Sequence, residues 1–201
     1  MAAEALRATY GLGPHDALIV VDVQNDFCPG GALAVPDGDQ VVAPLNRWIE
    51  AVLRGGGKVC YTHDWHPADH CSFRQNGGPW PPHCVQGTFG AAFHPALRVH
   101  GPVFRKGFLP DREAYSGFEG HLDGDPGKPA LGSWLKNQGV ERVFVGGLAT
   151  DYCVQATVLD ACKEGFTVLV LTDAVRAVNV QPTDGTAALA AMQAAGARLV
   201  P

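Results

Sequence analysis

An acid, a cation and a thiol each stand at the end of an apolar segment that is typical of a buried strand. Asp22 ends the run 17–22, Lys106 follows 103–105, and Cys153 comes shortly after 142–147. Parallel strands end at one edge of their sheet, where ligands bind, so these side chains are expected to share one crevice. Such a set supplies a nucleophile, a base and a cation that keeps the base ionised and oriented.

Cys153 lies where the chain is expected to turn from a strand into a helix. A helix N-terminus lowers the pKa of a nearby thiol, and its backbone N–H groups hold an oxyanion. Taken singly, the residues have plainer interpretations, with Asp22 capping a turn, Lys106 on the surface and Cys153 as a packed thiol. Their coincidence at strand ends favours the catalytic interpretation.

A second group of residues has the composition of a transition-metal site. Its members are Asp64, His66 and His70, and then His83, which follows Pro81-Pro82. One carboxylate with two or three imidazoles suits Zn, Fe or Mn rather than Ca or Mg. Histidines in exposed loops without a metal are the plainer alternative. Cys71 and Cys84 are additional candidate ligands, although Cys71 beside Ser72-Phe73 is more typical of packing.

Hydrophobic periodicity predicts an alternation of strands and helices along the whole chain. Strands are expected at 17–22, 58–62, 103–105, 142–147, 167–171 and 198–200, and helices at 41–54, 129–138, 151–164 and 183–195. This alternation predicts an α/β fold, a doubly wound and mostly parallel sheet with helices on both faces. The loop 64–102 between two strands is long for a compact domain, which is typical of a functional segment.

Length and composition limit the class of protein. A chain of 201 residues is expected to form one domain, 1–201, with residues 1–15 as a flexible N-terminal extension. The 15 basic and 20 acidic residues give a net charge of −5, which disfavours a nucleic-acid partner. With 46% hydrophobic and 17% charged residues, the chain has enough apolar mass for a core and is not expected to be disordered.

The lengths of the apolar runs, the cysteines and the missing motifs indicate the cellular location and limit the possible ligands. The apolar runs are too short for a membrane span and no export signal is visible, so the six cysteines are expected to be free thiols in the cytoplasm. A Gly-rich dinucleotide fingerprint, a phosphate-binding Walker motif and a Gly-x-Ser-x-Gly elbow are all missing. Nucleotide binding and serine hydrolysis are therefore disfavoured.

Several motifs together carry a family resemblance. They are Val21-Asp-Val-Gln-Asn-Asp-Phe-Cys28, Asp64-Trp-His-Pro-Ala-Asp-His70, Trp80-Pro-Pro-His-Cys84, Arg105-Lys-Gly107, Tyr115-Ser-Gly-Phe118 and Gly147-Leu-Ala-Thr-Asp-Tyr-Cys-Val154. From about residue 16 onward the chain resembles the nicotinamidases of the isochorismatase-like cysteine hydrolase superfamily. The resemblance implies the isochorismatase-like hydrolase fold. It also implies the hydrolysis of nicotinamide to nicotinate and ammonia, which is a step of NAD salvage. Members of the family commonly act on pyrazinamide as well.

The resemblance also assigns catalytic roles by position. It implies that Cys153 attacks the amide carbon, that Asp22 moves the proton and that Lys106 lies beside them. The backbone N–H groups of Ala149 and Cys153 would form the oxyanion hole, next to a cis peptide between Leu148 and Ala149.

The resemblance further implies a metal and an aromatic binding pocket. Asp64, His66 and His83 would bind one divalent metal ion (Zn, Fe or Mn), which with its waters positions the pyridine nitrogen. Phe27 and Trp80 would flank the substrate ring, with Tyr115 near it. Two positions vary among relatives: the histidine at His70 does not always bind the metal, and Tyr152 is often His.

Alternative functions follow from the same residues. One is another amidohydrolase of this superfamily, acting on a small amide or ureido acid, a group that generally lacks the metal motif. Another is a non-catalytic metal- or ligand-binding domain with a structural thiol. In each case the expected partner is a small molecule rather than a nucleic acid or a membrane. The Ala-rich last helix is a possible surface for a homo-oligomer.

Overall fold

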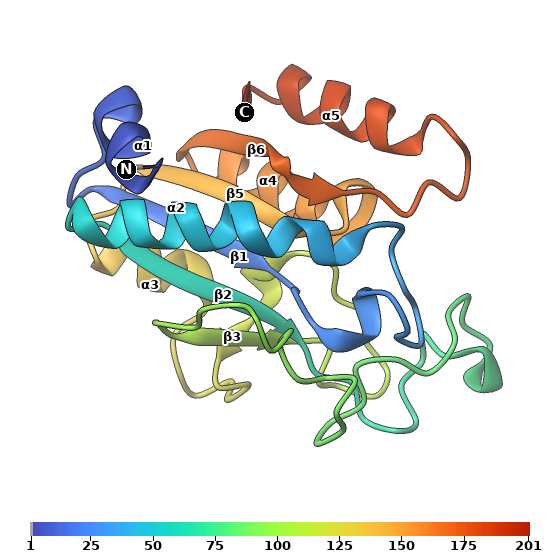
Figure 1. The fold of residues 1–201 in the computed structure, drawn as a ribbon. Helices are drawn as coiled ribbons and strands as arrows, with labels where there is room; N and C mark the ends of the chain where they lie inside the picture. Colours follow the sequence, from blue (N-terminus) through green and yellow to red (C-terminus); the bar gives the residue numbers. More distant parts are fainter. Residues whose placement is uncertain (1) are drawn as a thin grey trace.

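The computed structural model describes residues 2–201 and contains one seven-stranded sheet (Figure 1). Its strands are β1 (Asp16–Val21), β2 (Lys58–Asp64), β3 (Val103–Lys106), β4 (His121–Leu122), β5 (Arg142–Leu148), β6 (Thr167–Arg176) and β7 (Arg198–Val200). The order is β4-β3-β2-β1-β5-β6-β7, and every neighbouring pair is parallel except β3 with β4. The predicted mostly parallel sheet is confirmed.

Helices cover both faces of this sheet (Figure 1). They are α1 (Ala2–Tyr10), α2 (Val42–Arg54), α3 (Leu131–Asn137), α4 (Gln155–Lys163) and α5 (Asp184–Ala194). Shorter helical turns are η1 (Asn25–Phe27), η2 (Gly38–Val41), η3 (Arg74–Asn76), η4 (Gly117–Glu119) and η5 (Thr150–Val154), the last a turn of π-helix. Across residues 2–201, none of the helices is long and apolar enough to cross a bilayer.

The sheet divides the interior into two hydrophobic cores. On one face, α2 buries Leu45 and Trp48 with Leu18 of β1. On the other, α4 and the opposite side of β1 meet through Val158 and Ile19. β1 is buried along its whole length because both of its faces are covered, which explains its continuous apolar run. The doubly wound arrangement with helices on both faces is therefore confirmed.

The N-terminal segment differs from the expected flexible extension. Met1 lies outside the described residues, but Ala2–Tyr10 form α1, which packs on α2. Its sequence is rich in strong helix formers, and the Tyr10 ring lies 5.0 Å from that of Trp48. Arg142 then donates to the backbone oxygen of Tyr10 and pairs with Asp16, so the segment is tied to the start of the sheet.

Two strands are longer than their sequence patterns indicate. β2 continues to Asp64, so this acid is a strand residue rather than the first residue of a loop. β6 continues to Arg176 past a register shift opposite Gly146, where the polar pair Thr172-Asp173 hides the strand pattern. The short antiparallel β4 was not predicted at all.

The order of the strands locates a crevice at the middle of the sheet. From β1 the chain adds β2 and β3 on one side and later β5, β6 and β7 on the other, so the winding reverses between β1 and β5. Ligands of doubly wound sheets bind outside the carboxyl ends at such a reversal. Asp22 follows β1 there, and the segment that carries Cys153 follows β5.

Candidate active site

Asp22, Lys106 and Cys153 meet at the reversal point. The Lys106 ammonium lies 3.0 Å from Asp22 Oδ2 and donates to Cys153 Sγ at 3.4 Å. It also donates to the Asp64 carboxylate and, at 3.2 Å, to the backbone oxygen of Ala114. The side chains of Asp22, Lys106 and Cys153 are all buried, and their electrostatic interactions are stronger there than in water. The predicted convergence of acid, cation and thiol is present in the structure.

Asp22 reaches Lys106 because the chain leaves the strand geometry at this residue. Its φ is +47°, a left-handed conformation that Asp tolerates better than most residues. Its N–H donates to the backbone oxygen of Thr62 at 3.3 Å, and the Thr62 hydroxyl donates to Asp22 Oδ1 at 2.7 Å. The turn therefore holds one carboxylate oxygen by a hydrogen bond and directs the other to the ammonium.

The thiol is presented by an irregular junction between β5 and α4. The peptide bond from Leu148 to Ala149 is cis, as the resemblance implied, and Cys153 lies in the π-helical turn η5. Gly147 precedes this junction with φ +126°, and a Cβ there would lie 2.1 Å from the backbone oxygen of Val21. Only glycine permits this close approach of β5 to β1, so it places the nucleophile segment beside the turn at Asp22.

The charges of the cluster depend on one cation shared by two acids. Burial raises the pKa of Asp22 above its ordinary value, and Lys106 only partly offsets this effect. Burial alone would lower the pKa of Lys106, but Asp22 and Asp64 raise it well above the usual range. Asp64 is held ionised, because Lys106 and His66 outweigh burial and lower its pKa. Asp22 is therefore the carboxylate most ready to bind a proton.

The pKa of the Cys153 thiol differs from the sequence prediction. Its pKa is raised well above the ordinary value because burial outweighs the attraction of Lys106. The expected lowering by a helix N-terminus is therefore wrong for this site. The resting thiol keeps its proton, and Asp22, with a carboxylate oxygen within 4.8 Å of the sulfur, is placed to accept it.

Asp64, His66 and His83 form a compact group of potential metal ligands. One donor atom from each lies within 4.8 Å of the others, and all three side chains are buried. The Nδ1 atoms of His66 and His83 donate to the backbone oxygens of Gly107 and Pro81, at 2.9 Å and 2.8 Å. These bonds place a ring proton on Nδ1, so Nε2 is the nitrogen of each ring that can bind a metal, and Nε2 of His66 lies 3.5 Å from Asp64 Oδ2. The residues present therefore fit a divalent metal.

His70 lies beside this group but is used differently. Its ring centroid is 4.1 Å from that of His66, yet its Nδ1 accepts from the Ser72 hydroxyl at 2.7 Å and its Nε2 donates to the backbone oxygen of Arg112 at 3.0 Å. Both nitrogens are therefore occupied by protein. Among residues 2–201, Cys71 and Cys84 belong to no group of potential ligands.

Gln24 lies in the motif Val21–Cys28, but its role as a positioning residue was not predicted. Its buried amide donates to the backbone oxygen of Asp64 at 2.8 Å and accepts from the backbone N–H of Asp64 at 2.9 Å. The side chain thus acts as a strand partner for the last residue of β2 after β1 has turned away at Asp22. It fixes the acid that both the cation and a metal would contact.

A small cavity of ≈ 40 Å³ lies over the thiol. Phe27, Trp80 and Tyr115, the three predicted substrate contacts, all line it, together with Cys153. Trp80 Nε1 donates to the Tyr115 hydroxyl at 3.1 Å, which ties two of the aromatic walls together. The remaining lining residues are Asp64, His83, Ala149, Leu33, Val35, Tyr152 and Val178, of which Leu33, Val35 and Val178 had no signal in the sequence.

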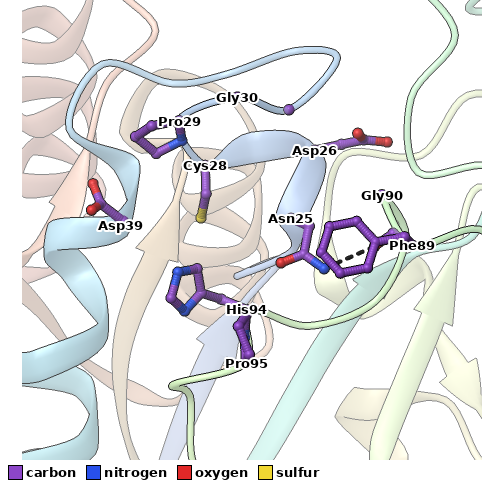
Figure 2. A pocket seen from close by; sticks show the side chains of 11 residues that line it. Asn25, Asp26, Cys28, Pro29, Gly30, Asp39, Phe89, Gly90, His94 and Pro95 are labelled. Atoms are coloured by element: carbon purple, nitrogen blue, oxygen red, sulfur yellow. Dashed lines mark hydrogen bonds between the residues drawn. The ribbon is translucent and has the colours of Figure 1, made fainter.

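A second cavity, of ≈ 370 Å³, lies on the other side of η1 (Figure 2). Figure 2 shows Cys28 pointing into it near His94, and Asn25 Nδ2 donates to the backbone oxygen of Phe89 at 2.8 Å. Burial and the charge of Asp39 raise the pKa of the Cys28 thiol to about 11.

The combination of groups around the small cavity defines its chemistry. A thiol lies beside a carboxylate that can take its proton, aromatic side chains form the walls, and a potential metal site borders the same space. Such a cavity suits one flat ring that carries an electrophilic carbon and a polar ring atom.

Comparison with known proteins places this arrangement in a family. The model of the isochorismatase domain matches residues 16–201. A nicotinamidase of Escherichia coli is 44% identical, with 92% of this chain and 94% of that protein covered.

Solved structures agree with the sequence comparison. A pyrazinamidase of Pyrococcus horikoshii in complex with zinc superposes with a TM-score of 0.84 at 48% identity, covering 93% of this chain and 99% of that one. The PnC1 protein of L. infantum in complex with nicotinate has a TM-score of 0.81 at 37% identity, covering 94% of each chain.

Proposed function

The chain belongs to the isochorismatase family and within it to the nicotinamidases, and we propose that it hydrolyses nicotinamide through a thioester on Cys153. One observation carries the catalytic assignment: the Cys153 thiol, the Lys106 ammonium and the Asp22 carboxylate are in contact beneath an aromatic cavity. The relatives that act on nicotinamide or pyrazinamide support the substrate class.

The first half-reaction forms the thioester. Asp22 accepts the Cys153 proton while the sulfur attacks the amide carbon, which gives a tetrahedral oxyanion. The N–H groups of Ala149 and Cys153 stabilise this oxygen, since both residues line the cavity. Asp22 then passes its proton to the amide nitrogen, the C–N bond breaks and ammonia leaves. The raised pKa of Asp22 suits a group that must both take and return a proton.

The second half-reaction releases the acid. Asp22, again ionised, takes a proton from a water molecule that attacks the thioester carbon. The C–S bond breaks, the sulfur recovers its proton from Asp22, and nicotinate leaves. Lys106 stays protonated throughout and keeps the negative charge of the cluster balanced.

Asp64, His66 and His83 would hold one divalent metal ion, for which Zn, Fe or Mn suits the donors. When bound, the metal with its waters supplies a Lewis acid that orients the pyridine nitrogen of the substrate. The chain prepares for this role by fixing the tautomer of both imidazoles through backbone oxygens. The zinc complex of the P. horikoshii relative supports a metal of this kind.

The aromatic walls account for a preference for a flat ring. Phe27 lies 5.6 Å from the His83 ring, and Trp80 and Tyr115 are joined by a hydrogen bond. A heteroaromatic amide between these side chains gains stacking and excludes water from the thiol. Pyrazinamide shares the planar ring and the ring nitrogen, so we expect it to be a second substrate.

The substrate assignment is tested by comparing four compounds. Ammonia release is measured from nicotinamide, pyrazinamide, benzamide and a small ureido acid, with the metal-loaded chain. We expect turnover of the first two and slow turnover of benzamide, which lacks the ring nitrogen. Turnover of the ureido acid in preference to nicotinamide would instead assign the chain to another amidohydrolase of the family.

The proposal also covers the metabolic role and the cellular location of the protein. Hydrolysis of nicotinamide is a step of NAD salvage, and the partner is a small molecule. The six free cysteines support a cytoplasmic location. A homo-oligomer through α5 and β7 stays a prediction.

A further inference from the structure

One wall of the active-site cavity comes from the segment 177–183, which joins β6 to α5. Val178 lines the cavity and packs on the apolar cluster that contains Phe27 and Ala149. The next residues face water: Val180 is 60% exposed, and 181–183 are exposed as well. Apolar packing therefore holds this segment mainly at Val178 and leaves its outer half free.

One carboxylate accepts hydrogen bonds from two consecutive backbone N–H groups of this wall. Asp151 Oδ1 accepts from the backbone N–H of Val178 at 2.9 Å, and Oδ2 accepts from that of Asn179 at 2.8 Å. Each oxygen thus binds one N–H, and hydrogen bonds to an ionised acceptor are among the stronger ones in proteins. Asn179 has φ +53°, which turns the two consecutive N–H groups toward one acceptor.

Asp151 belongs to the same helical turn as the nucleophile. It lies in η5, two residues before Cys153 and next to Tyr152, which also lines the cavity. A shift of the segment 177–183 relative to η5 would therefore change the distance between the thiol and the opposing wall. No other side chain of residues 2–201 has a hydrogen bond to the backbone of Val178.

We propose that Asp151 is a positioning residue for substrate binding, which acts by holding Val178 against the ring of the bound amide. This role rests on the proposed hydrolysis of nicotinamide. Asp151 does not contact the reacting atoms, so its loss is expected to weaken substrate binding more than the chemical steps at Cys153. A looser wall is also expected to admit rings with additional substituents.

The variants follow from the contacts. Asp151→Ala removes both acceptors, and Asp151→Asn keeps one. Val178→Ala keeps the loop in place but shortens the wall. Asp184→Ala is the matched control, because Asp184 accepts from the backbone N–H of Gln181 in the same segment and has no hydrogen bond to Val178.

Steady-state kinetics with nicotinamide provide the first readout. Losing charge-assisted hydrogen bonds at Val178 and Asn179 is expected to raise KM by about ten-fold in Asp151→Ala, with kcat changed less than about three-fold. Asp151→Asn should fall between this variant and the parent. Asp151→Ala and Val178→Ala should both accept ring-methylated nicotinamides better, relative to nicotinamide, than the parent does. Asp184→Ala should keep the parent's KM and its relative activities.

Hydrogen exchange at the amides of Val178 and Asn179 provides a second readout that needs no substrate. We expect faster exchange in Asp151→Ala and parent-like exchange in Asp184→Ala. A fall in kcat with unchanged KM, equal effects of Asp184→Ala, or unchanged exchange in Asp151→Ala would each overturn the proposal. If the parent itself leaves nicotinamide intact, the proposed function fails, whereas the exchange experiment still decides whether Asp151 holds the wall.

Discussion

Replacing Lys106 with Met tests how the buried charges are balanced. The side chain is fully buried and contacts two carboxylates, Asp22 at 3.0 Å and Asp64 more closely. Methionine has a similar length and no charge, so the variant leaves the acids without their cation. Removing one partner of a buried ion pair costs about 3–5 kcal/mol of unfolding free energy. For a chain of this size, that corresponds to a fall in Tm of roughly 6–20 °C.

The loss depends on pH in a defined direction. In the parent, the lowered pKa of Asp64 stabilises the folded state above the ordinary carboxyl value, and this stability disappears as the pH falls. Lys106→Met removes the main cause of that lowering. The difference in Tm between parent and variant is therefore expected to be largest near pH 7 and to shrink as the pH falls below about 4.

A double variant separates charge from packing. Adding Asp22→Asn to Lys106→Met removes one of the two unpaired carboxylates, so part of the lost stability should return. Thermal unfolding is followed by circular dichroism at about pH 3 and about pH 7 with a chelator present, which removes any contribution of bound metal. Unfolding of the single variant within about 1–2 °C of the parent at pH 7 would refute this role of Lys106, since at about 2–4 °C per kcal/mol it corresponds to a loss of less than about 1 kcal/mol. This role is also refuted if the double variant is less stable than the single one.

Three further outcomes follow from the site. Asp22→Asn should abolish turnover yet raise Tm at pH 7, since Lys106 keeps Asp64 as its partner and the raised pKa of Asp22 means that its ionisation lowers stability as pH rises above about 3.8. Equal Tm values for parent and variant from pH 4 to pH 8 would contradict this. Chelation should stop or strongly slow nicotinamide hydrolysis while leaving the circular dichroism spectrum unchanged, and an undiminished rate in demonstrably metal-free protein would remove the metal from substrate orientation. Gln24→Glu should weaken metal binding, measured by calorimetry, by at least about ten-fold, because it places a carboxylate against the backbone oxygen of Asp64. An affinity equal to that of the parent would argue against the positioning role of Gln24.

The parts of the site that were predictable lie at the ends of strands. Asp22, Lys106 and Cys153 each follow or end a recognisable apolar run, and a parallel sheet brings such ends together whatever the loops do. The metal group was predictable from residue types alone, because Asp64 and His66 are close in sequence and His83 follows a rigid turn.

The parts that were missed depend on contacts between distant segments. Gln24 acts on Asp64 across 40 residues, and Val178 follows a strand whose polar residues conceal its length. The pKa of Cys153 was predicted in the wrong direction because sequence shows the helix start but not the depth of burial. The helix α1 was missed because it has only nine residues, too few for a long periodic pattern, and its packing of Tyr10 on Trp48 joins segments that are distant in sequence.

Cys153 is the proposed nucleophile of a nicotinamide hydrolase. This role is tested by measuring ammonia release from nicotinamide with the parent and with Cys153→Ala at equal metal content. We predict rapid release by the parent and none by the variant, with the same fold in both. Release by the variant at a rate near the parent's would contradict this role.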